Sequence, residues 1–146
     1  MQVKTSKSSL YLKLLGALIK NGHKLKAKKI IDEAFFYAGN TTLIPLDRIL
    51  LKLFLVLNTF VETKTLSIKR RSYTIPFAIN LKRRIYLAIS WLLKAVSENK
   101  KRLPFSIKLG MEIHSILKSK SSLALRFKKL NCKQAILNRA NIHYRW

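Results

Sequence analysis

Acidic residues are scarce in this chain of 146 residues: six aspartates and glutamates face thirty lysines and arginines. The formal net charge is +24, so most cations have no acidic partner within the chain. Self-repulsion of this size destabilises a compact protein unless an external polyanion neutralises it. Nucleic acid is the first candidate partner, since each phosphate that accepts a lysine or arginine releases condensed counterions. An anionic membrane is the second, and a merely well-solvated basic surface is the third.

Groups that carry catalysis or bind metals are also few. Cys132 is the single cysteine, which excludes an intramolecular disulfide and a multi-cysteine metal cluster. His23, His114 and His143 lie far apart, and none has metal-ligand spacing to another histidine or to Cys132. We expect the six dispersed acids to lie mostly on outward helix positions, in local ion pairs. The sequence therefore predicts no enzyme, no metal, no cofactor and no small-molecule substrate.

Long apolar runs are missing. The longest, such as residues 53–57, have five residues, whereas about 20 are needed to cross a bilayer. Lys13 interrupts the apolar stretch after Ser9, which argues against a signal peptide. The first arginine is Arg48, which argues against an arginine-rich transit peptide. We therefore expect the chain to work where it is made, or in an organelle that encodes it.

What the chain does have is enough apolar material, 49% of its residues, for one folded core. Apolar residues recur at i, i+3, i+4 and i+7, which predicts six amphipathic helices. The expected ranges are about 9–20, 24–38, 46–58, 82–96, 105–118, and a sixth after Ser121-Ser122. Ser8 or Ser9 is the expected cap of the first helix, and Asn21-Gly22 its end. Gly39-Asn40 is the expected end of the second.

Residues 60–79 differ in character, because threonine, valine, isoleucine and tyrosine dominate. The stretch 73–79 reads as a strand, and Pro76 within it suits an edge strand because proline has no N–H. We predict a β-hairpin here, with Lys69, Arg70 and Arg71 at its tip. The expected fold is a mainly α, six-helix single domain over residues 9–146, with the hairpin between the third and fourth helices. Residues 1–8 would form a short basic arm.

The cations are clustered rather than scattered, in the second helix, the hairpin tip, the start of the fourth helix, the loop after it and the start of the sixth. A helix N-terminus carries partial positive charge, so three cations at residues 82–84 are unfavourable there unless phosphates approach. We predict that these clusters bind RNA. Their residues are Lys24, Lys26, Lys28, Lys29, Lys69, Arg70, Arg71, Lys82, Arg83, Arg84, Lys100, Lys101, Arg102, Lys118, Lys120, Arg126, Lys128 and Lys129.

Three stretches also resemble a known family. The ending Asn138–Trp146, with the sequence NRANIHYRW, closely resembles the C-terminus of the bacterial-type small-subunit ribosomal protein seven family. The strand stretch 73–76 (YTIP), followed by a helix containing 88–91 (AISW), resembles its central signature, and residues 18–24 (LIKNGHK) resemble its first helix and turn. The resemblance covers about residues 9–146, and the C-terminal motif is its specific part.

The chain departs from the family pattern at several places. Lys69 and Arg70 stand where the family usually has two glycines, Ala78 where a glutamate is common, and Asn141 where the motif has a phenylalanine. The hairpin is therefore expected to bend differently while carrying more charge. The basic N-terminal arm is reduced to about nine residues, which leaves open how far Lys4 and Lys7 replace it.

The resemblance implies a role. Members bind the 3′ major domain of small-subunit ribosomal RNA and nucleate assembly of the head, beside other head and platform proteins. The hairpin would lie near the exit-site transfer RNA and the messenger RNA path. Arg139 and Arg145 would hold ribosomal RNA, and His143, Tyr144 and Trp146 would stack on bases or, equally, pack the last turn against the core. The amino-acid composition is that expected of a protein encoded by an AT-rich genome, and two other residues replace the family's glycine pair. Both features favour a mitochondrial member of the family, with a plastid as second choice.

Two other functions compete with this interpretation. A free helix-turn-helix nucleic-acid-binding module would use residues 8–38, but it has no place for the hairpin or the C-terminal motif. A basic peripheral membrane protein needs a helix with a lone, exposed apolar face, whereas we expect the six apolar stripes to cover one another.

Overall fold

The computed structural model describes residues 7–42, 45–118 and 121–145. Over these residues the chain is mainly α-helical, with one antiparallel hairpin between the third and fourth helices. This confirms the predicted fold class. The elements are α1 (Lys7–Leu18), α2 (Lys24–Thr42), α3 (Leu46–Leu57), β1 (Val61–Ile68), β2 (Arg71–Ala78), α4 (Leu81–Glu98), α5 (Phe105–Leu117), α6 (Leu123–Leu137) and a 3-10 helix, η1 (Arg139–Tyr144).

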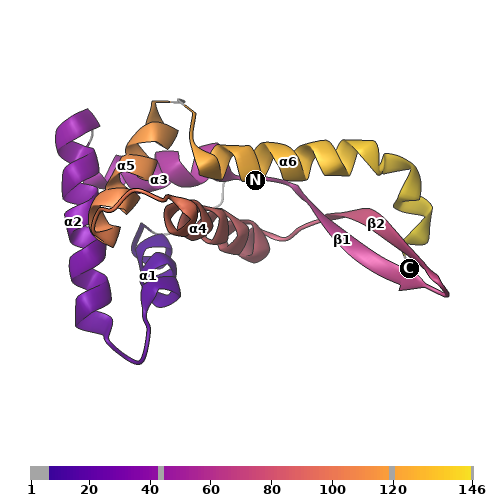
Figure 1. Cartoon of the computed structure of the whole chain (residues 1–146), viewed down its shortest axis with the longest axis horizontal. Helices are drawn as coiled ribbons and strands as arrows, with labels where there is room; N and C mark the ends of the chain where they lie inside the picture. Colours follow the sequence, from indigo (N-terminus) through magenta and orange to yellow (C-terminus); the bar gives the residue numbers. More distant parts are fainter. Residues whose placement is uncertain (1–6, 43–44, 119–120, 146) are drawn as a thin grey trace.

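Helices α1 to α5 form the body of the molecule around one apolar core (Figure 1). Apolar side chains from all five helices supply that core: Leu14 of α1, Ile31 of α2, Leu53 of α3, Leu92 of α4 and Ile113 of α5 are each fully buried. Burying a large aliphatic side chain contributes about 1.5–3 kcal/mol. The body is therefore held together by the spacing of apolar residues in the sequence.

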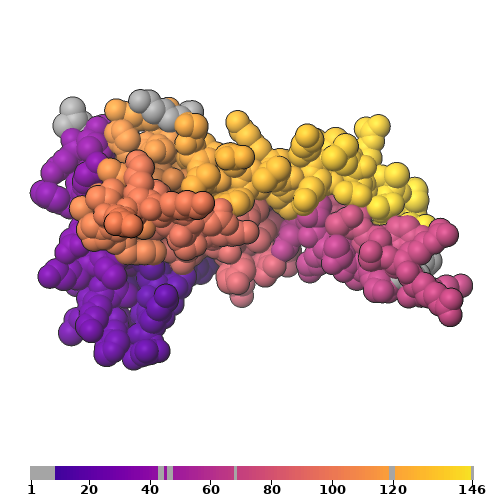
Figure 2. Space-filling model, viewed as in Figure 1, coloured from indigo at the N-terminus to yellow at the C-terminus, as the bar shows by residue number. Residues whose placement is uncertain are grey.

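The hairpin and α6 leave the body together and form an extension on one side of it (Figure 1). In the hairpin, Val61 pairs with Ala78, Thr63 with Pro76, and Ile68 with Arg71. Pro76 therefore lies on a strand of a two-stranded sheet, where its missing N–H is tolerated. In Figure 2, α6 lies against the hairpin along the extension.

The hairpin turn consists of Lys69 and Arg70, and Arg71 already begins β2. Lys69 has a φ of 55°, a left-handed conformation that costs a non-glycine residue about 1–2 kcal/mol. The two-residue turn is thus kept although glycine is absent from it. The tip holds a lysine where the backbone favours glycine, so its charge is retained at some cost in stability.

Two helix boundaries differ from the prediction. Ser8 and Ser9 lie inside α1 and are not its caps. Helix α2 runs through Gly39 and Asn40 to Thr42, so the predicted end at these residues is wrong. The threonine hydroxyls of the last turn donate to main-chain oxygens, Thr42 to that of Ala38 at 2.7 Å, and Ala38 is fully buried. Tertiary packing and these hydrogen bonds outweigh the low helix propensity of glycine and asparagine.

Two other boundaries are confirmed. Asn21 and Gly22 have positive φ values of 51° and 75° and follow the end of α1, as expected of residues that tolerate this conformation. Ser122 is the N-cap of α6, and its hydroxyl accepts a hydrogen bond from the N–H of Leu125 at 3.3 Å. Capping of this kind stabilises a helix by about 1 kcal/mol.

Helix α6 exposes much of its apolar surface. Among its described residues only Ala124 is buried, and Leu130, Ile136 and Leu137 are more than half exposed. The expectation that six apolar stripes cover one another is therefore wrong for α6, because this helix projects beyond the body. None of the described helices has the length and apolar character to cross a membrane.

Candidate nucleic-acid interface

The predicted cation clusters of the second helix and of the loop after α4 lie at the surface. Every one of their side chains is exposed: Lys24, Lys26, Lys28, Lys29, Lys100, Lys101 and Arg102. The ammonium of Lys108, nearby on α5, donates to the main-chain oxygen of Asn99 at 3.0 Å and so holds that loop. Exposed, unburied cations are the type of group that binds the phosphates of RNA.

The hairpin tip carries a second exposed group of cations. Lys69, Arg70 and Arg71 are all exposed, at the end of the extension and away from the body (Figure 1). A cationic tip held at a distance can reach an RNA that the body does not touch. This is the geometry that the sequence predicts for these three residues.

Two of the three cations at the start of α4 have partners within the protein. Lys82 is exposed, but the guanidinium of Arg83 donates two hydrogen bonds to the carboxylate of Glu62, at 2.9 and 2.5 Å. Arg84 donates to the main-chain oxygen of Ile79 at 3.0 Å and lies over the ring of Phe60 at 4.2 Å. Two of the three cations therefore join the hairpin to α4 within the protein. Their unfavourable position at a helix N-terminus is offset by these contacts.

The Glu62–Arg83 pair gives the hairpin base a dependence on pH. Hydrogen bonding from Arg83 lowers the pKa of the Glu62 carboxyl below its ordinary 4.5, and the same contact raises the pKa of Arg83. A lowered carboxyl pKa means that the pair stabilises the fold above about pH 4.5 and loses that contribution as the pH falls further. Because Arg83 is partly exposed, the contribution is at most about 1 kcal/mol.

Glu62→Gln is therefore expected to lower the free energy of urea unfolding by up to about 1 kcal/mol at neutral pH. The difference from the unchanged chain should vanish well below pH 4.5. Glu33→Gln, which removes an exposed carboxyl from α2, is the matched control. A constant difference between Glu62→Gln and the unchanged chain at both pH values would contradict the assignment.

The cations near α6 also differ in whether they have a partner within the protein. Lys118, Arg126 and Lys129 are exposed, whereas the ammonium of Lys128 donates to the main-chain oxygen of Val56 at 2.5 Å. That oxygen belongs to the last turn of α3, which has no partner within its own helix. Lys128 thus caps α3 and ties α6 to the body. Lys120 lies outside the described residues.

The C-terminal motif lies along strand β2. The Asn141 amide donates to the main-chain oxygen of Thr74 at 3.0 Å, and the Tyr144 ring stacks on that of Tyr73 with centroids 4.8 Å apart. The guanidinium of Arg145 donates to the main-chain oxygen of Pro76, with its Nε at 2.6 Å. The motif therefore braces the hairpin, and packing is the role that the structure gives Tyr144 and Arg145. Its partner is the hairpin rather than the body.

A second set of contacts joins α6 itself to β1. The side-chain amide of Asn131 donates to the main-chain oxygen of Val61 at 2.8 Å. The main-chain N–H of Thr63 donates to the side-chain oxygen of Asn131 at 3.4 Å. One asparagine thus satisfies main-chain groups along the strand edge, which would otherwise need water. Together with the C-terminal motif, it holds α6 and the hairpin as one unit.

Arg139 and His143 of the motif remain exposed, so they keep the predicted access to RNA. Lys4, Trp146 and the side chain of Lys7 lie outside what the structure describes. Within the described residues, no group of three or more histidine, cysteine, aspartate or glutamate side chains could hold a metal ion.

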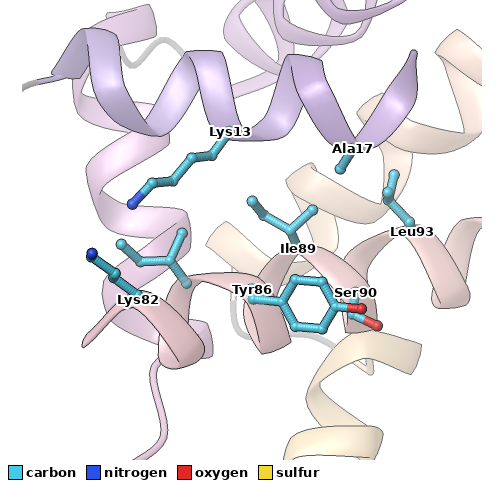
Figure 3. A pocket seen from close by; sticks show the side chains of 8 residues that line it. Lys13, Ala17, Lys82, Tyr86, Ile89, Ser90 and Leu93 are labelled. Atoms are coloured by element: carbon cyan, nitrogen blue, oxygen red, sulfur yellow. The ribbon is translucent and has the colours of Figure 1, made fainter. Parts of the chain in front are cut away.

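The structure adds two residues, Lys13 and Tyr86, that the sequence did not single out as functional. Lys13 of α1 and Lys82 of α4 point toward one another across a groove that Tyr86 also lines (Figure 3). In the sequence, Lys13 only interrupts an apolar run, and Tyr86 sits beside an apolar helical stripe. The sequence feature that could have indicated this site is the position of Tyr86 off that stripe, since such a position exposes a large aromatic side chain. It is 59% exposed.

Comparison with known proteins identifies the family. The family model described as "Ribosomal protein S7p/S5e" matches residues 2–139. "Small ribosomal subunit protein uS7" of Wigglesworthia glossinidia brevipalpis is 27% identical over 143 residues, 95% of this chain and 88% of the relative. "Small ribosomal subunit protein uS7m" of Reclinomonas americana is 29% identical over 140 residues, 94% of this chain and 86% of the relative. Because the family model covers nearly the whole chain, this protein belongs to the ribosomal protein S7p/S5e family.

Proposed function

We propose that this protein is a structural component of the small ribosomal subunit. The observation that carries the proposal is the family match over residues 2–139, together with relatives named as small-subunit proteins. The structure supplies what such a role needs, which is exposed cation clusters on a compact body. Ribosomal RNA neutralises the charge of +24.

The RNA contact that we propose is with the 3′ major domain of the small-subunit ribosomal RNA, where the protein nucleates assembly of the head. The exposed lysines of α2, the loop at 100–102 and the exposed cations near α6 would bind its phosphates. Contacts to phosphates fix position and orientation on RNA without reading sequence. Other head and platform proteins would be the neighbours on the remaining surface.

The hairpin would serve a different RNA, the exit-site transfer RNA, close to the messenger RNA path. Support comes from its construction: α6 and the C-terminal motif brace both strands, and three exposed cations lie at the tip. A braced arm presents its charge in one place, which reduces the conformational entropy lost on binding. The subunit that we propose is mitochondrial, supported by the relative named uS7m, with a plastid as the second choice.

Sedimentation of small subunits tests the role directly. The tagged chain, expressed in a mitochondrial extract, should comigrate with small subunits at moderate salt. Recovery only in free or membrane fractions would contradict the role. Recovery with plastid rather than mitochondrial subunits would show that the protein belongs to a plastid.

Replacing Lys69, Arg70 and Arg71 together by alanine separates the two RNA contacts in the same assay. Subunit incorporation should change little, while the affinity of purified subunits for exit-site transfer RNA should fall about tenfold, or about 1.4 kcal/mol. The matched control removes the same charge from α2, as Lys24→Ala, Lys26→Ala and Lys28→Ala. This control should lower incorporation instead, and loss of incorporation with the hairpin variant would show that the tip binds structural RNA.

A further inference from the structure

A groove of about 510 Å³ runs between α1 and α4 (Figure 3). Its size is within the range of sites that enclose small ligands. Apolar side chains form its walls, with the two lysines toward one end and two hydroxyls close together toward the other. The lining residues are Lys13, Ala17, Lys82, Ile85, Tyr86, Ile89, Ser90 and Leu93.

The cations of the groove are not neutralised within it. Lys13 and Lys82 are both exposed and point toward one another in Figure 3, and none of the described lining residues is acidic. Two like charges brought together are unfavourable unless an anion lies between them. This end of the groove is therefore suited to an anionic group.

The aromatic ring of the groove is held in place. Tyr86 is 59% exposed, and the guanidinium of Arg83 lies over its ring at 5.0 Å. Arg83 is itself fixed by two hydrogen bonds to Glu62. A ring whose orientation is already set loses little freedom when a second planar group stacks on it.

We propose that this groove binds one unpaired nucleotide of RNA, an inference that rests on the proposed function. The base stacks on Tyr86 against the apolar wall of Ile89 and Leu93, and a flanking phosphate lies between Lys13 and Lys82. The hydroxyls of Tyr86 and Ser90 face the base edge. A nucleotide combines the three properties that this lining requires: a planar apolar body, polar edges and a phosphate.

An acidic peptide is the competing occupant, and the lining favours the nucleotide over it. A carboxylate would satisfy the lysines, but it has no planar body to stack on the exposed part of the Tyr86 ring. The groove also differs from the recess at the start of α2, whose lining residues, Gly22, His23, Lys24, Leu25 and Lys26, include no tyrosine, phenylalanine or tryptophan ring. A base that has left its helix therefore finds a stacking partner in the groove.

The test uses the full chain and short oligouridylate that carries 4-thiouridine. Crosslinking by light, followed by trypsin and mass spectrometry, should modify the peptide of residues 85–94, which cleavage after Arg84 and Lys94 releases. High salt suppresses binding that depends on phosphate alone. An abasic oligomer with the same backbone is the competitor that lacks the base, and polyglutamate is the competitor that resembles an acidic peptide.

Tyr86→Leu should lower crosslinking of this peptide and the affinity of that site about 5- to 150-fold, the range that stacking of one base provides. Tyr86→Phe should keep the interaction, because the ring remains. Phe36→Leu, which alters an exposed aromatic side chain on α2, is the matched control and should change nothing. Lys13→Gln should weaken the oligouridylate and the abasic oligomer alike, since both have the phosphate.

The outcomes separate this inference from the proposed function. Unchanged crosslinking with Tyr86→Leu would overturn the nucleotide site while comigration with small subunits still stands. Equal competition by the abasic oligomer or by polyglutamate would overturn it too, because the groove would then respond to charge alone. The sedimentation experiment is a separate measurement. If the chain did not enter small subunits, the proposed function itself would be contradicted.

Discussion

Replacing Gly110 by alanine is expected to lower the free energy of unfolding by about 1–2 kcal/mol. Gly110 lies where α5 packs against α2, and an added Cβ would approach the main-chain oxygen of Ala34 to 2.9 Å and Cδ1 of Tyr37 to 2.8 Å. The tyrosine ring can move, but the main chain at the buried Ala34 cannot without separating the helices. Overpacking costs about 1–3 kcal/mol, and the gain in helix propensity of about 1 kcal/mol offsets only part of it.

Gly16→Ala is the matched control, because a Cβ there meets no atom within 4 Å. Gly16 lies in α1 and is exposed, so the same substitution should stabilise the protein by about 0.5–1 kcal/mol. Urea unfolding followed by circular dichroism measures both changes. The expected signs are opposite, and stabilisation by Gly110→Ala would show that α2 and α5 can separate freely.

Glu112→Ala is expected to lower the free energy of unfolding by more than Gly110→Ala does, by about 3 kcal/mol. Glu112 of α5 is buried, with 8% of its surface exposed. Its carboxylate accepts hydrogen bonds from the Ser122 hydroxyl at 2.7 Å and from the Ala124 N–H at 3.0 Å. A hydrogen bond to a charged group contributes about 1.5–3 kcal/mol, and the variant leaves a buried N–H without a partner. The carboxylate also lies at the positive end of α6.

Glu112→Gln keeps an acceptor oxygen and loses the charge, so it should cost less, about 1 kcal/mol. Glu98→Ala, at the exposed pair with Lys94 (3.8 Å), is the surface control and should cost at most about 0.5 kcal/mol. Thermal unfolding orders the three variants, and amide exchange of Ala124 and Leu125 reports on the start of α6. Equal stabilities for Glu112→Ala and Glu98→Ala would contradict the capping role.

Glu112 is an exception to the expectation that the acids lie mostly on outward helix positions. The expectation of mostly outward acids holds for Asp32, Glu33 and Glu98, which are exposed, but not for Glu112. Its position in α5 gives no sign that the start of another helix will lie beside it. Burial of a charge depends on the partner groups that the fold brings to it, and these come from ten and twelve residues further along the chain.

The family resemblance and the cation clusters could be predicted from the sequence. Which cations form hydrogen bonds within the protein and which remain exposed could not. Arg83, Arg84, Lys128 and Arg145 were expected to contact RNA, and each donates hydrogen bonds within the protein. An arginine that will pair with a distant main-chain oxygen looks the same in a sequence as one that will bind a phosphate. Whether these four also reach RNA stays a prediction.

By itself, the sequence determined that this protein is a helical domain with an unpaired excess of positive charge, a hairpin at residues 60–79 and a C-terminal motif of known type. These properties are local, because they follow from residue spacing, turn residues and charge. Only the tertiary structure decided that the C-terminal motif braces the hairpin and that Lys13 faces Lys82 beside Tyr86. Such contacts join residues more than sixty positions apart, and no local preference of the chain encodes them.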